Sequence, residues 1–196
     1  MIIENKIKYI HIPRTGGKFL KESLSKALNV DLPHGIDKDF DIEGMHLHYP
    51  LYLEDADLEY FTVIRDPFER LTSLIKIHYM FYEKNIFDLI KLKKYFFLFI
   101  ENHRKDYSVR NNWYRPQVDF IHSKTKIWHY SLGYGEKFNL WFKEQFNISL
   151  SLIETSKTKE YTNIDITQEM LSLREYCYEY YEKDYILSQK VLKELQ

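Results

Sequence analysis

Cysteine is almost absent from this chain, since Cys177 is the only one among 196 residues. A single thiol rules out an internal disulfide and a zinc site built from several cysteines. Cys177 stands among tyrosines in a pattern typical of a helix. We therefore expect it to be packed in the interior rather than chemically reactive.

Net charge is nearly absent too, because 28 lysines and arginines face 29 aspartates and glutamates, which leaves −1. No overall field draws such a protein to nucleic acid or to an anionic membrane. The longest apolar run, residues 95–100, is far shorter than a membrane span. The opening "MIIENKIKYI" carries acidic and polar residues where a signal peptide needs an apolar core. These features predict a cytoplasmic protein with no membrane span and no nucleic-acid partner.

What the chain does contain is an alternation of strand and helix patterns. Runs rich in β-branched and aromatic residues predict four strands, at residues 8–12, 60–64, 126–130 and 150–154. Helical spacing of apolar residues separates them, and a helix is expected from Thr167 towards the C-terminus. This order is typical of an α/β fold with a parallel sheet flanked by helices, and the length suits a single domain over residues 1–196.

The chain leaves the first predicted strand through "HIPRTGG", where a proline, a cation and two glycines precede a helical pattern. Glycines let the backbone approach an anion closely, and helix N-terminal N–H groups together with Arg14 favour a phosphate-like group. An ordinary turn with a surface arginine is the alternative. The pattern G-x-x-x-x-G-K-[ST] is absent, and with it the hydroxyl that would hold Mg²⁺.

The second predicted strand ends in the same way, in "VIRDPFERLTS". Arg65 can bind a phosphate through two hydrogen bonds, and the hydroxyl of Ser73 can donate from the adjoining helix. Parallel strands end at one edge of a sheet, where open α/β folds bind ligands, so the two junctions predict two separated anion sites for one ligand. We expect Asp66, Glu69 and Arg70 to cap the helix and brace this motif.

Together, "HIPRTGG" and "VIRDPFERLTS" resemble the hallmark stretches of the sulfotransferases, particularly the carbohydrate-type, family 2-like branch. The resemblance continues in "NNWYRPQVDFI" (residues 111–121) and in "YYEKDYIL" (residues 180–187). It implies a P-loop-like fold and transfer of a sulfuryl group from 3′-phosphoadenosine-5′-phosphosulfate (PAPS) to a hydroxyl. The acceptor would be a carbohydrate, the product adenosine 3′,5′-bisphosphate (PAP), and the displacement in line and without metal.

The resemblance also carries roles over to individual residues. Arg14 stands where the family has a lysine on the leaving-group side, and Arg65 with Ser73 would hold the 3′-phosphate. Lys18 and Phe19 replace the small hydroxyl residues usual after the glycines, so expected phosphate donors are lost, and the ammonium of Lys18 could compensate. The donor-binding residues implied are Arg14, Thr15, Gly16, Gly17, Lys18, Phe19, Arg65 and Ser73.

Sulfuryl transfer also needs a base, and "EGMHLHYPLYL" offers two histidines upstream of the second strand. The family has a catalytic histidine in this interval, in a pattern that fits His48 better than His46. A His-x-His pair could instead hold a metal, although no third ligand stands at short spacing, or serve a structural role. His11, inside the first strand, is expected to be packed and hydrogen-bonded.

Other functions remain open from the residues alone. A phosphoryl-transfer enzyme of P-loop type would need Mg²⁺ ligands that the first loop does not supply. The changes at Lys18 and Phe19 also allow an inactive relative that only binds a nucleotide. The lysines of "KLKKYF" could draw an anionic acceptor or simply form a solvated helix face. Trp113, Tyr114 and Tyr134 suit adenine stacking, an acceptor cleft and core packing alike.

Overall fold

The computed structural model describes residues 2–3, 6–29, 57–82, 94, 96–98, 114–150, 152 and 170–196. His46 and His48 lie outside these residues, as do Trp113 and most of the lysine-rich segment 84–106.

The described strands form one four-stranded sheet in the order β1-β2-β3-β4. They span Ile2–Ile3, Ile7–Ile10, Glu59–Ile64 and Thr125–His129. β2 pairs parallel with β3, and β3 pairs parallel with β4, so the expected parallel α/β sheet is confirmed for these three strands. β1 pairs antiparallel with β2 and was not expected from the sequence. Of the strand expected at 150–154, the structure describes Leu150 and Leu152, and neither lies in a strand.

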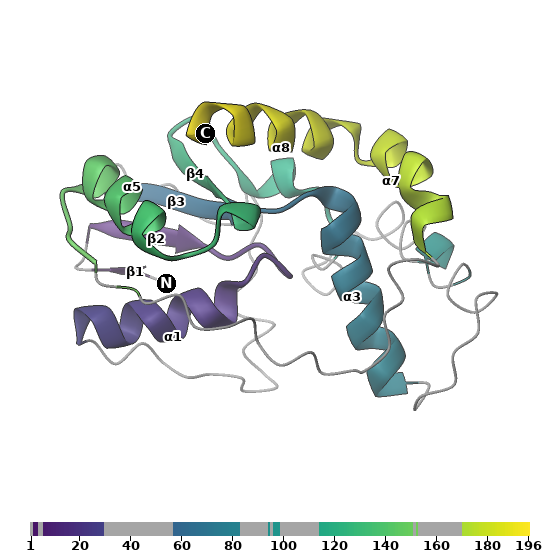
Figure 1. The fold of residues 1–196 in the computed structure, drawn as a ribbon, viewed down its shortest axis with the longest axis horizontal. Coiled ribbons are helices and arrows are strands. Elements are labelled where there is room, and N and C mark those ends of the chain that lie inside the picture. Colours follow the sequence, from purple (N-terminus) through teal and green to yellow (C-terminus); the bar gives the residue numbers. More distant parts are fainter. Residues whose placement is uncertain are drawn as a thin grey trace.

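Helices flank this sheet. They are α1 (Gly17–Leu28), α3 (Pro67–Tyr82), α5 (Glu136–Phe146), α7 (Arg174–Tyr180) and α8 (Glu182–Leu195), with short 3-10 turns η2 (Gln117–Phe120), η3 (Tyr130–Leu132) and η4 (Leu171–Leu173). α1 and α8 lie on opposite faces of the sheet, and α3 and α7 extend beyond its carboxyl end (Figure 1). The single C-terminal helix expected from Thr167 is instead interrupted at Tyr181, between α7 and α8.

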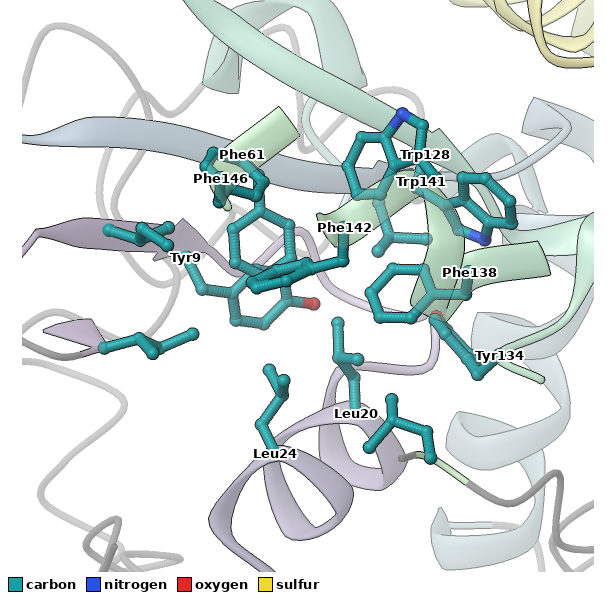
Figure 2. Close-up of a cluster of buried hydrophobic side chains, with 14 residues drawn as sticks. Tyr9, Leu20, Leu24, Phe61, Trp128, Tyr134, Phe138, Trp141, Phe142 and Phe146 are labelled. Atoms are coloured by element: carbon teal, nitrogen blue, oxygen red, sulfur yellow. The ribbon is translucent and has the colours of Figure 1, made fainter. Parts of the chain in front are cut away.

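The main core lies between the sheet and the helices α1 and α5, and aromatic rings fill it (Figure 2). Phe61 in β3 is at its centre, fully buried, with its ring centroid 4.9 Å from Tyr9 and 5.3 Å from Phe142. Residues that alternate with these along the strands face the other side, where Ile64 and Tyr60 pack near Val191 of α8. The period-2 alternation thus distributes apolar side chains to both covered faces of the sheet.

Among the helices formed by the described residues, none combines the length and the apolarity that crossing a bilayer requires.

The aromatic core yields a stability prediction. Replacing Phe61 with alanine removes a fully buried ring that contacts Tyr9 and Phe142. It should lower the free energy of unfolding by about 3–5 kcal/mol. The control is Leu140→Ala on α5, where the side chain is 55% exposed and the expected change is within about 0.5 kcal/mol. Urea denaturation measures both variants, and equal effects would contradict this position of the core.

Candidate functional site at the carboxyl edge of the sheet

The carboxyl ends of β2, β3 and β4 meet at one edge because these strands run parallel. In register, Ile10 pairs with Thr62 and Ile64 with His129. The loop after β2, the residue Arg65 after β3 and the turn η3 after β4 therefore lie at the same edge, beside the start of α3 (Figure 1). Both sequence junctions that suggested anion binding are located here.

The loop after β2 adopts an unusual backbone conformation. Arg14 has φ 68° and Gly16 has φ 85°, both left-handed, and α1 begins at the next residue, Gly17. A left-handed arginine costs about 1–2 kcal/mol relative to a right-handed one, so other contacts must hold it. Two of these contacts involve Thr15, whose hydroxyl donates to Ile12 O at 2.8 Å and whose carbonyl accepts from the Tyr134 hydroxyl at 2.8 Å.

Both glycines of this loop are required by internal packing. A Cβ on Gly16 would come within 2.8 Å of the Tyr130 ring and of the Tyr134 hydroxyl. A Cβ on Gly17 would overlap the ring of His11, which also stacks on Tyr9 with the ring centroids 5.8 Å apart. The ring of His11 is thus packed, as expected, but β2 ends at Ile10, so His11 lies just beyond the strand and not inside it. From the sequence, the glycines were expected to let a ligand approach the backbone closely. In the structure they also let the side chains of Tyr130, Tyr134 and His11 pack against the loop.

The two helix N-termini at this edge differ in how they are capped. α1 has Gly16 as its N-cap and no acidic residue in its first turn. At α3, by contrast, Asp66 Oδ1 accepts the backbone N–H of Glu69 at 3.0 Å, and Asp66 Oδ2 accepts the hydroxyl of Tyr178 at 2.9 Å. The expected capping role of Asp66 is confirmed. The N-terminus of α1 thus carries no carboxylate of its own that would repel an anion.

Arg14 and Ser73 are in direct contact, which joins the first sequence motif to the second. The guanidinium of Arg14 donates to Ser73 Oγ from Nη2 at 2.8 Å and from Nε at 3.2 Å. The sequence had assigned these residues to two separated anion sites. In the structure a single cation extends from the β2 loop to the second turn of α3.

Arg65 also lies at the carboxyl edge of the sheet, directly after β3. Its guanidinium carbon lies 4.5 Å from the ring centroid of Tyr130, and its Nε donates to Glu69 Oε2 at 3.1 Å. The side chain of Arg65 is 20% exposed and that of Glu69 is 53% exposed. A planar cation stacked on a ring keeps its edge available for hydrogen bonds, and here Glu69 uses part of that edge.

A buried polar network lies beneath these residues. Arg70, which is 4% exposed, donates from Nε to Pro13 O at 2.9 Å and from Nη1 to Arg115 O at 2.9 Å. Asp184 in α8 accepts the N–H of Gln117 at 2.7 Å and that of Val118 at 3.0 Å. Arg70 thus braces the loop after β2, which belongs to the first motif, whereas the sequence had led us to expect it to brace its own motif.

Burial shifts the pKa of both charged members of this network towards their neutral forms. It raises the pKa of the Asp184 carboxyl to about 6, against the opposing effect of the Arg70 charge and of the two backbone N–H groups. It lowers the pKa of Arg70, while the charge of Asp184 acts in the opposite direction. Each member therefore relieves part of the cost of burying the other.

His129, the last residue of β4, is a site-edge residue that the sequence reasoning missed. It is buried, with Nδ1 2.7 Å from Ser131 Oγ and Nε2 2.9 Å from Ser188 Oγ of α8. Burial lowers its pKa, which keeps the ring neutral at pH 7. The sequence did contain one signal for His129, because it lies near the end of a predicted parallel strand, where ligand sites form. Both ring nitrogens engage serines, so His129 ties this edge to α8.

The structure describes only some of the other residues that the sequence singled out. The ring of Phe19 lies 5.4 Å from that of Tyr134 and packs against the main core. The side chain of Lys18 lies outside the described part of the structure, as do His46 and His48. Cys177 is buried, and burial raises its pKa, as expected for a packed thiol.

Among the described residues, no group of three His, Cys, Asp or Glu side chains is arranged to hold a metal ion. A shallow hollow of about 230 Å³ includes Thr125 at the amino end of β4 and Glu194 of α8. It lies at the opposite edge of the sheet from Arg14 and Arg65 and contains no residue of either motif.

Comparisons of the chain with protein-family models, with curated proteins and with solved structures find no match. The fold class is mixed α/β, with a three-stranded parallel sheet flanked by helices. Function is therefore inferred from the residues at the carboxyl edge themselves.

The buried carboxyl of Asp184 yields a pH prediction. Its pKa is about 6 when folded and near its ordinary value of 3.8 when unfolded, so the folded state binds the proton more tightly. This group therefore adds stability as the pH falls from about 6 to about 4, by up to about 3 kcal/mol. Asp184→Asn removes that contribution.

Urea denaturation of both proteins from pH 7 to pH 4 measures the effect. The free energy of unfolding of the wild type minus that of Asp184→Asn should grow as the pH falls through 6. A difference that stays constant or shrinks would contradict the raised pKa of Asp184.

Proposed function

We propose that this protein is a PAPS-dependent sulfotransferase that transfers a sulfuryl group to a hydroxyl of a carbohydrate acceptor. The observation that carries the proposal is the convergence of the two motifs: Arg14 of "HIPRTGG" contacts Ser73 of "VIRDPFERLTS", and Arg65 lies at the same sheet edge. Both motifs were recognised from sequence alone. Their meeting at the ligand-binding edge of a parallel sheet is what a shared nucleotide site requires.

The β2 loop would hold the 5′-phosphosulfate end of the donor. Its residues Arg14 and Gly16 are left-handed, a conformation that recurs in the backbone turns that bind anions. The dipole of α1 adds to this attraction, and its first turn carries no acidic residue. Arg14 brings a full positive charge, which suits stabilisation of a leaving phosphate.

Arg65 and Ser73 would hold the 3′-phosphate of the same donor. The guanidinium of Arg65 is held against Tyr130, so little side-chain entropy is lost when it binds a bidentate anion. Ser73 accepts from Arg14 and keeps its own O–H for donation. Because Arg14 and Ser73 touch, the two phosphate-binding regions are coupled through one hydrogen-bonded pair.

The reaction we propose is a single in-line displacement. An acceptor hydroxyl oxygen forms a bond to sulfur while the bond from sulfur to the bridging oxygen of the 5′-phosphate breaks, and PAP leaves with that electron pair. His48 takes the proton of the hydroxyl, with His46 as the alternative base, and Arg14 stabilises the charge that develops on the leaving phosphate. No metal takes part in this scheme.

The role of Arg65 can be tested by ligand binding. Arg65→Ala should weaken binding of PAP by about tenfold to a hundredfold, because charge-assisted hydrogen bonds to the 3′-phosphate are lost. It should also remove the preference for PAP over adenosine 5′-monophosphate, which lacks that phosphate. Isothermal titration calorimetry with both nucleotides measures the two effects.

The matched control is Arg174→Ala, because Arg174 also lies over an aromatic ring, 5.1 Å from the centroid of Phe68, and belongs to neither motif itself, although Phe68 belongs to the second. Its affinity for PAP should equal that of the wild type. Wild-type affinity in Arg65→Ala would remove the 3′-phosphate assignment.

For the Arg65–Glu69 ion pair we predict the opposite effect, a variant that binds PAP more tightly. A phosphate that binds Arg65 competes with the Glu69 carboxylate, so Glu69→Gln should strengthen PAP binding. An exposed pair of this kind is worth little, so we expect a gain of about twofold to fivefold, smaller at high salt. Glu194→Gln is the control, because Glu194 forms a similar i,i+4 pair with Lys190 on α8. Unchanged or weaker binding by Glu69→Gln alone would contradict this competition.

A further inference from the structure

The backbone of Arg65 is held on both sides by one buried side chain. The amide of Gln117 accepts the Arg65 N–H at 2.9 Å through Oε1 and donates from Nε2 to the Arg65 carbonyl at 2.7 Å. Gln117 is fully buried, at 0% exposure. A primary amide that satisfies the donor and the acceptor of one residue fixes the orientation of that peptide segment more firmly than a single bond would.

Arg65 needs such a partner because it lies one residue beyond the end of the sheet. The parallel register of β3 with β4 ends at Ile64 and His129, so the strand ladder does not supply partners for Arg65. Buried or half-buried backbone groups must find hydrogen bonds elsewhere. Gln117 supplies both of them from a segment far away in the sequence.

Gln117 is itself fixed by the last helix. Asp184 of α8, which is 1% exposed, accepts the N–H groups of Gln117 and Val118 at 2.7 and 3.0 Å, so η2 begins at a defined place. The Gln117 side chain then holds Arg65. A rigid connection therefore leads from α8 through η2 to the residue whose guanidinium stacks on Tyr130.

We propose that Gln117 is a positioning residue for the 3′-phosphate site, acting through Arg65 and not by touching the nucleotide. This inference rests on the proposed function of Arg65. Gln117 sets the backbone from which the Arg65 side chain leaves, and so sets where the guanidinium meets the phosphate. Small displacements of a charged donor cost much of a bidentate interaction.

The chain offers a matched control for this arrangement. Asn139 of α5 holds Leu152 in the same manner, accepting the Leu152 N–H at 3.2 Å through Oδ1 and donating from Nδ2 to the Leu152 carbonyl at 3.0 Å. Leu152 belongs to the main core and not to the carboxyl edge. Gln117→Met and Asn139→Leu each remove a pair of side-chain-to-backbone bonds while keeping a similar side-chain volume.

The test is a double-mutant cycle with PAP as the ligand, measured by calorimetry at a temperature where every variant is folded. The proteins are the wild type, Gln117→Met, Arg65→Ala, the double variant, and Asn139→Leu. We expect Gln117→Met to weaken PAP binding about tenfold when Arg65 is present and to have no further effect when Arg65 is alanine, which is the signature of two coupled residues. Asn139→Leu should lower the melting temperature without changing affinity.

Four outcomes would overturn the inference. Wild-type affinity in Gln117→Met refutes the positioning role while leaving the donor site intact. An equal loss in both Arg65 backgrounds, or an equal loss in Asn139→Leu, assigns the effect to general destabilisation. Failure of the wild type to bind PAP refutes the proposed function, and the positioning role with it, so the two failures are distinguishable.

Discussion

The carboxyl edge of the sheet depends on one buried cation, Arg70. Its two hydrogen bonds, to Pro13 O and Arg115 O, join the loop after β2 to the segment that leads into η2. Asp184 supplies the opposite charge from α8. The attraction between these two charges offsets part of the cost of burying each of them. Arg70 thus holds the left-handed loop after β2, while Asp184 holds Gln117, whose side chain holds the backbone of Arg65.

Much of this edge was predictable from local sequence signals. Period-2 and helical patterns gave the three parallel strands and the helices after them, and the Asp-Pro step gave the capped start of α3. The contacts that hold the site together were not predictable, because they join residues far apart in the chain. Asp184 and Gln117 are 67 positions apart, and Tyr134 and Thr15 are 119 apart. A single hydrogen bond of this kind leaves no periodic trace in a sequence.

The short antiparallel β1 has too few residues to show a pattern, and the break at Tyr181 occurs within a continuous helical pattern.

Many charged side chains at the carboxyl edge are already paired with or hydrogen-bonded to other residues of the protein. Glu69 pairs with Arg65, Asp66 caps α3, and Ser73 accepts from Arg14. A ligand must compete with these partners, and a doubly charged phosphate does so better than a neutral group or a single carboxylate. Intramolecular pairing of this kind keeps cationic side chains ordered before binding, which lowers the entropic cost of association.

Calorimetric titration of the wild-type protein with PAP, and with ADP and ATP alongside, each with and without Mg²⁺, tests whether the carboxyl edge of the sheet binds PAPS. A PAPS-dependent sulfotransferase should bind PAP tightly, with no requirement for the metal and with a clear dependence on the 3′-phosphate. A preference for ATP in the presence of Mg²⁺ would contradict the account in favour of phosphoryl transfer, and binding of none of the three would contradict a nucleotide site at this edge.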